Sequence, residues 1–194
     1  MNKTRLEAFS DGVLAIIITI MVLELKVPHE ASFEALRQLL PVFISYIMSF
    51  VYIGIYWGNH HHLLHAVKQV NSRIMWSNMG LLFFLSLVPF STAWMGVNHF
   101  APLPVAVYGV NMVLAGLSYS ILETAIRKHY PHSTALTEAL KRQKKKEYIS
   151  TVIYVTSIPC AFFYPLVSAM CFVVVSILWV IPDKHIEQAL KEEV

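Results

Sequence analysis

The chain has 194 residues, of which 56% are hydrophobic and only 14% are charged, and its mean hydropathy is +0.56. A soluble domain carries roughly 25% charged residues, so most of this surface must face lipid rather than water. The formal net charge of +3 is small, and its basic residues lie between apolar segments, which argues against nucleic acid as a partner. The composition therefore predicts an all-α integral membrane protein surrounded by a lipid bilayer.

Six apolar segments approach the roughly 20 residues that a membrane-spanning helix needs. They cover roughly residues 4–26, 36–64, 72–97, 102–126, 148–164 and 166–183. They lack the period-two alternation of barrel strands. Pro41, Pro89 and Pro159 fall inside segments and could kink their helices. With no linker or repeat to divide the segments, we expect one six-helix domain over residues 1–194.

The basic residues predict the orientation of these segments, because short cytoplasmic loops collect Lys and Arg. Two basic residues, Lys26 and Arg37, fall on one side of the membrane. The others fall on the opposite side: Lys3, Arg5, Lys68, Arg73, the cluster from Arg127 to Lys146 (with Lys141, Arg142, Lys144 and Lys145), Lys184 and Lys191. We therefore expect both termini in the cytoplasm, which requires an even number of spans.

The first segment carries unusual polar residues for a membrane helix. Arg5, Ser10 and Asp11 lie at or within the membrane, where ionisable groups are costly and usually paired. Ser10 or Asp11 could instead cap a helix start, although residues 5–9 contain no helix breaker. Arg5 and Asp11 are six positions apart and do not share a helical face. A buried polar network and an interfacial cap are both open at this point.

A stripe with helical spacing follows in the same segment. It consists of Gly12, Ile16, Thr19, Ile20 and Leu23, at i, i+4, i+7, i+8 and i+11. Such a stripe, apolar except for Thr19, is usually core or lipid-facing surface. A more specific function needs support from other residues.

That support is a resemblance to a known family. The run Arg5-x-x-x-Phe9-Ser10-Asp11-Gly12, with Ala15-Ile16 and Thr19 after it, resembles the first-helix signature of the transmembrane protein 175 family. Further blocks that resemble this family are Tyr56-Trp57-x-Asn59-His60-His61-His62-Leu63, Asn78-x-x-Leu81-Leu82 and Leu87-x-Pro89-Phe90-Ser91-Thr92. The later segments resemble the family mainly in hydropathy.

The resemblance implies a homotetrameric, potassium-permeable channel whose pore is lined by the first helix of each chain. By position, Ile16 matches the narrowest apolar constriction, Ile20 and Leu23 match further apolar rings, and Thr19 matches a hydroxyl layer associated with selectivity. The family pattern also places a buried polar network between the first two helices. Its candidate members here are Arg5, Ser10, Asp11, Asn59, His60 and His61. No Thr-Val-Gly-Tyr-Gly filter sequence is present.

The sequence leaves two alternatives to a channel, a histidine metal site and a secondary transporter. His60, His61, His62 and His65 could hold a metal, since His61 and His65 lie one turn apart, but a zinc site needs three or four converging ligands. We therefore expect no metal site, no other cofactor and no enzymatic activity. A secondary transporter, with or without coupling to protons, would ordinarily show internal repeats, and the first-helix signature occurs once. We expect a channel in the plasma membrane of a prokaryote, with potassium ions as its cargo.

Overall fold

The computed structural model describes residues 2–65, 67–129 and 134–180, with the backbone alone described for 134–142. Within these residues the chain forms eight helices and no strand, which confirms the all-α prediction for this part of the chain. The helices are α1 (Lys3–Leu23), α2 (Phe33–Gln38), α3 (Leu40–His65), α4 (Ser72–Ser86), α5 (Val88–Val97), α6 (Pro102–His129), α7 (Thr134–Ala161) and α8 (Pro165–Val180). The tail residues Lys184 and Lys191 and the end of the sixth predicted span lie outside the described residues.

Three helices begin at a residue whose side chain accepts a hydrogen bond from the first turn. The acceptor is Asn2 for α1, Ser32 for α2 and Asn71 for α4. Each cap satisfies a backbone N–H group that has no partner within its helix. The cap of α1 is therefore Asn2, and Ser10 and Asp11 lie well inside the helix instead of at its start.

The three prolines within the predicted spans have different structural effects. Pro41 lies in the first turn of α3, because this helix begins at Leu40 rather than near residue 36. Proline is tolerated there, since the first N–H groups of a helix have no intrahelical partner, and the predicted segment is interrupted at Leu39, two residues before this proline. Pro89 lies at the start of α5, next to the break at Leu87. Pro159 lies inside the last turn of α7, two residues before the helix ends at Ala161.

Four helical segments among the described residues are long and apolar enough to cross a membrane. They are Lys3–Leu23, Leu40–His65, Ser72–Val97, which joins α4 and α5, and Pro102–His129. α8 is a shorter apolar helix of 16 residues. The predicted span 148–164 corresponds to the second half of α7, whose first half is strongly charged. The number of six spans stays a prediction.

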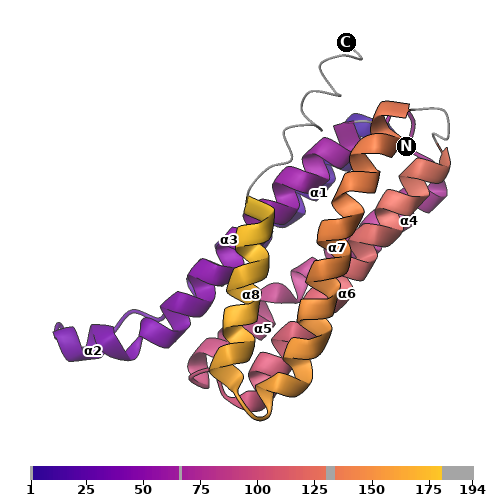
Figure 1. Cartoon of the computed structure of the whole chain (residues 1–194). Coiled ribbons are helices and arrows are strands. Elements are labelled where there is room, and N and C mark those ends of the chain that lie inside the picture. The colour runs from indigo at the N-terminus through magenta and orange to yellow at the C-terminus, as the bar shows by residue number, and fades with distance from the viewer. Residues whose placement is uncertain (1, 66, 130–133, 181–194) are drawn as a thin grey trace.

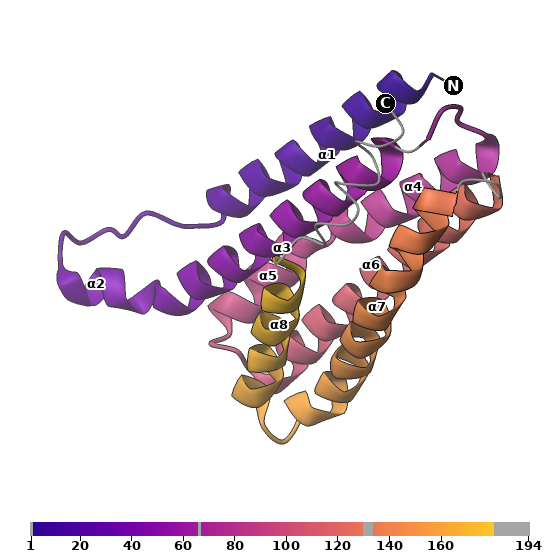
Figure 2. The ribbon, with the colours of Figure 1, turned by 45° about the horizontal axis from the view of Figure 1, so that its top comes forward.

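The helices pack as a bundle (Figure 1), and α1 lies along one edge of it (Figure 2). α1 packs against α3, α4 and α5, whereas α6 packs against α4, α5, α7 and α8. α2 contacts α3 and lies at the end of the molecule away from the bundle (Figure 1). One face of α1 is therefore packed against the bundle, and the other side of the helix is left exposed by the described residues.

Aromatic residues join α3, α6, α7 and α8 in the core. The ring centroids of Tyr108 and Phe172 lie 5.1 Å apart, and those of Tyr154 and Phe172 lie 6.1 Å apart. The Tyr52 hydroxyl donates to the carbonyl of Phe172 and accepts a hydrogen bond of 2.8 Å from the Tyr154 hydroxyl. A buried hydroxyl needs such a partner, because leaving it unpaired costs about 1–3 kcal/mol.

Gly96 allows α5 to lie directly against the start of α3. A β-carbon at this position would lie 2.5 Å from Ser45 Oγ and 2.7 Å from the α-carbon of Val42. Small residues permit this close approach of helix backbones, which is a common way for membrane helices to associate.

We predict that Gly96→Ala destabilises the protein by about 1–3 kcal/mol, because the added methyl group meets backbone that must move away. Gly80→Ala in α4 is the matched control, since a β-carbon there meets nothing within 4 Å. The control should be neutral or slightly stabilising, as alanine is the better helix former. Thermal unfolding of the purified variants in detergent measures both. An unfolding midpoint of Gly96→Ala equal to that of the wild type would contradict the prediction.

Candidate functional site

The first helix, α1, has one face buried against the bundle. The buried residues recur every three or four positions: Leu6, Ser10, Leu14, Ile17 and Met21. This spacing places them on a single side of a helix with 3.6 residues per turn. They meet α3, α4 and α5, so α1 is attached to its own chain through this face.

The predicted stripe lies on the other side of α1. Ile16 is 58% exposed, Ile20 43% and Leu23 72%, and Gly12 and Thr19 are also exposed. The hydroxyl of Thr19 donates to the carbonyl of Ile16 at 2.8 Å. Because its proton is used inside the helix, the oxygen keeps its lone pairs for a group outside α1. The stripe is thus a continuous surface that a single chain leaves uncovered.

A chain of buried hydrogen bonds attaches α1 to α3 and α4. Asn78 Nδ2 donates to Ser10 Oγ at 2.9 Å, and Ser10 Oγ donates to the Leu6 carbonyl at 2.8 Å. On its other side Asn78 Oδ1 lies 2.6 Å from His60 Nε2. Since Oδ1 can only accept, this nitrogen of His60 is the donor. Ser10 and Asn78 are fully buried and His60 is 2% exposed.

Asp11 takes part in a separate contact at the surface. The indole nitrogen of Trp57 donates to Asp11 Oδ1 at 3.0 Å. The Trp57 ring is half exposed and stacks on His61, with ring centroids 6.2 Å apart. α3 therefore holds α1 directly through the exposed contact at Trp57, and indirectly through the buried bond from His60 to Asn78 of α4.

The other predicted members of the polar network lie elsewhere. The side chain of Asn59 donates to the carbonyl of Ile55 in its own helix at 2.9 Å. His61 is exposed and contacts the rings of His62 and His65 besides Trp57. Arg5 is exposed as well. Of the predicted set, the buried chain of hydrogen bonds brings together Ser10 and His60, with Asn78 between them.

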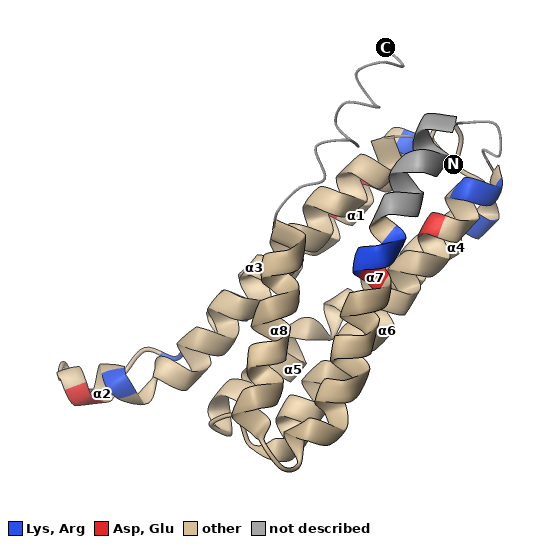
Figure 3. Ribbon diagram, viewed as in Figure 1, with Lys and Arg blue, Asp and Glu red and all other residues tan. Residues whose placement is uncertain are grey.

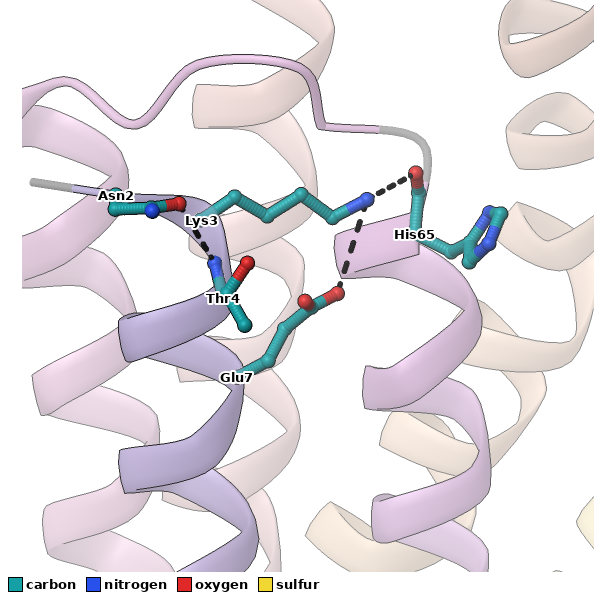
Figure 4. A network of polar contacts seen from close by, with 5 residues as sticks. All are labelled: Asn2, Lys3, Thr4, Glu7 and His65. Carbon is teal, nitrogen blue, oxygen red and sulfur yellow. Dashed lines mark hydrogen bonds and ion pairs between the residues drawn. The ribbon is translucent and has the colours of Figure 1, made fainter.

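A third contact ties the start of α1 to the end of α3, as Figure 4 shows. Lys3 Nζ donates to the carbonyl of His65 at 2.8 Å and lies 3.8 Å from the Glu7 carboxylate. A lysine at the last carbonyls of a helix also interacts favourably with the helix dipole. Lys3, predicted only as an orientation signal, therefore also anchors the helix end.

Among the described residues, no group of three or more His, Cys, Asp or Glu side chains could hold a metal ion.

Asn78 was not among the predicted network members. Its signal was present in the sequence, since an asparagine in an otherwise apolar span must find hydrogen-bond partners.

Comparison with known proteins adds to this geometry. The family model described as endosomal/lysosomal potassium channel TMEM175 matches residues 5–89, which contain α1 from Arg5 onward and every member of the buried chain of hydrogen bonds. A protein from Chryseobacterium named as a potassium channel is 53% identical over 192 residues, covering 99% of this chain and 100% of the relative. The chain belongs to the TMEM175 family.

Further TMEM175 relatives agree with this assignment. A potassium channel from Streptomyces collinus is 36% identical over 131 residues, covering 63% of this chain and 64% of that protein. The crystal structure of a lysosomal potassium-selective channel TMEM175 homolog from Chamaesiphon minutus matches with a TM-score of 0.76 and 26% identity. The match covers 92% of this chain and 96% of that structure. As a TMEM175 member, the chain is a membrane channel and not an enzyme.

We predict that Asn78→Ala loosens α1 in this TMEM175 protein and lowers its stability. The change leaves the buried His60 without its acceptor and Ser10 without its donor, and a buried unsatisfied group costs about 1–3 kcal/mol. Asn98→Ala is the control, because the exposed Asn98 side chain, directly after α5, donates to the Trp94 carbonyl of that helix and joins no other helix among the described residues. Hydrogen exchange of the α1 amides should increase for Asn78→Ala and not for the control. Equal exchange in both variants would show that Asn78 does not hold α1.

Proposed function

We propose that this chain assembles as a homotetramer that forms a potassium-permeable cation channel in the plasma membrane of a prokaryote. Residues 1–194 act as one six-span unit, and the first helix of each copy lines the central pore. Relatives covering the whole chain, or nearly so, are named as a potassium channel and as a potassium-selective channel, which supports potassium as the permeant ion.

The observation that carries the proposal is the uncovered stripe of α1. Ile16, Thr19 and Leu23 stay exposed although the opposite face of the same helix is firmly packed. One helix cannot enclose a path for ions, so several copies must contribute their first helices. A symmetric ring of copies would place each stripe residue in a layer around the axis.

The constriction is assigned to Ile16, with Ile20 and Leu23 as further apolar rings. Side chains that narrow a pore enough to exclude water block ions by dewetting. A small outward rotation of the ring would admit a partly hydrated cation. Potassium loses its hydration shell more readily than sodium does, so an apolar passage favours potassium.

The hydroxyl layer is assigned to Thr19. Its proton is donated to the Ile16 carbonyl, so the oxygen can offer its lone pairs to a passing cation without a fixed charge. Four such oxygens at one depth would form a ring of neutral ligands directly beside the constriction.

Both termini are assigned to the cytoplasm. In Figure 3 the basic residues of α4, α6 and α7 lie toward one end of the bundle, whereas α2 with its single basic residue lies at the other end. Cytoplasmic loops are enriched in Lys and Arg, which supports this orientation. Lys141 and Arg142, whose side chains lie outside the described part, belong to the same cluster in the sequence.

The first test is the reversal potential of the purified protein in a planar bilayer, with potassium chloride on one side and sodium chloride on the other. We expect a value displaced toward the potassium equilibrium potential, because the apolar passage favours the ion that dehydrates more easily. Solute uptake by vesicles without any current would instead establish a carrier and remove the pore assignment of α1.

We also predict that Ile16→Ser wets the constriction, raises sodium permeation and moves this reversal potential toward zero. Ile177→Ser in α8 is the matched control, since its isoleucine is 59% exposed compared with 58% for Ile16. The control should keep the wild-type reversal potential, as α8 does not line the proposed pore. Unchanged permeation in Ile16→Ser would exclude this residue from the constriction.

A further inference from the structure

A cavity lies inside the subunit, among α3, α6, α7 and α8 and apart from the stripe of α1. Its volume is about 60 Å³, which corresponds to about four to six water-sized groups. Four tyrosines and a tryptophan line it together with one carboxylate: Tyr52, Tyr56, Tyr119, Tyr154, Trp179 and Glu147. Gly116 also lines the cavity, and a β-carbon on it would lie 3.9 Å from the Tyr56 hydroxyl. The glycine thereby keeps this part of the space open.

The polar tips of most of these aromatic side chains already have partners. Tyr52 and Tyr154 bond to Phe172 and to each other, as described above. The Tyr119 hydroxyl donates to the carbonyl of Asn59 at 3.2 Å, and the Trp179 indole donates to Ser150 Oγ at 2.8 Å. An occupant of the cavity would therefore contact mainly the ring surfaces of these residues.

The carboxylate is only partly satisfied. Glu147 Oε2 accepts from Ser120 Oγ at 2.9 Å. Glu147 Oε1 and Glu123 Oε2 are buried and receive no hydrogen bond from a group outside the pair, and Glu123 is 2% exposed. The two carboxyl groups hydrogen-bond to each other, which requires a proton shared between them, because an ionised carboxylate can only accept.

Two adjacent buried carboxylates repel each other unless a proton or a cation compensates their charge. Arg127 and Lys144 act on Glu123 through space. However, the ion pairs found within 4 Å among the described residues are Lys3–Glu7 and Arg37–Glu34. With one shared proton the pair keeps one negative charge, and this charge is left for an occupant of the cavity to neutralise.

We propose that this cavity binds a small alkylammonium ion, with its positive charge at Glu147 and its alkyl groups against the aromatic rings. Aromatic faces attract cations, and aromatic boxes are a known means of holding substituted ammonium groups. An anion would be repelled by the carboxylates, and a neutral apolar molecule would leave them uncompensated. Mg²⁺ or Ca²⁺ would need six or more oxygen ligands, and most of the hydroxyl groups that line this cavity are already engaged in hydrogen bonds.

The test uses the full-length protein in detergent and isothermal titration calorimetry with tetramethylammonium chloride at constant ionic strength. tert-Butanol is the neutral probe, because both molecules have the same number of non-hydrogen atoms. We expect saturable binding of tetramethylammonium and no binding of tert-butanol. Equal binding of the two probes, or no binding of tetramethylammonium while the protein remains folded, would overturn the proposal. The second result would show that a shared proton alone compensates the carboxyl pair.

Substitutions in the chain test where the ion binds. Glu147→Gln keeps the shape of the side chain and can still accept from Ser120, so we expect a folded protein with at least about tenfold weaker binding. Glu34→Gln is the matched control in α2, far from the cavity, and should bind like the wild type. Gly116→Val should abolish binding by filling the cavity beside Tyr56. Wild-type affinity in Glu147→Gln or Gly116→Val would overturn the proposal.

Ile16→Ser distinguishes this site from the proposed pore. It should bind tetramethylammonium like the wild type, since Ile16 does not line the cavity. Loss of binding in Ile16→Ser with normal binding in Glu147→Gln would place the ion in the pore and contradict the cavity site. No current is recorded in this series, so its outcome is independent of whether the chain conducts potassium.

Discussion

The position of α1 depends on one buried amide, that of Asn78. This side chain donates to Ser10 on α1 and accepts from His60 on α3, so one residue of α4 joins three helices. In an environment without water, each of these groups would be costly to leave unpaired. A shift of α1 by one residue would rotate its side chains by about 100° and break the bond to Ser10. The amide therefore determines which residues of α1 point outward.

This restraint explains how an apolar stripe can be kept uncovered without loss of order in the helix. Leu6, Leu14 and Ile17 supply the packing on the buried side, and the bond to Ser10 supplies the rotational register. At the helix start, Lys3 bonds to the end of α3. The exposed side is then available for the pore-lining role proposed for it, since its residues are not part of the packing on the buried side.

Much of this arrangement follows from helical periodicity. The spacing of Gly12, Ile16, Thr19, Ile20 and Leu23 predicted a common face, and the structure brings all five to one side of α1. Periodicity cannot tell whether such a face points toward the core, the lipid or a pore, because the stripe and the buried face are both largely apolar. The resemblance to a known family selected the outward assignment, which remains part of the proposal.

The partners of the polar residues were harder to predict, for a geometric reason. Asn59, His60 and His61 are consecutive, so their side chains point in directions about 100° apart, and only His60 meets Asn78. Which of the three faces α4 depends on how α3 is rotated against its neighbours, and the local sequence does not contain this information. The pairing of Glu123 with Glu147 likewise depends on the alignment of α6 and α7 along their length.

The same geometry links the first helix to the internal cavity. α3 presents Trp57 and His60 toward α1 and α4, and it presents Tyr52 and Tyr56 to the cavity. A movement of α1 that preserves its bonds to Asn78 and Trp57 must carry α3 with it, because both bonds reach that helix directly or through one residue. α3 also forms a wall of the cavity, so the same helix connects the proposed pore helix and the proposed cavity site through hydrogen bonds and packing within one subunit.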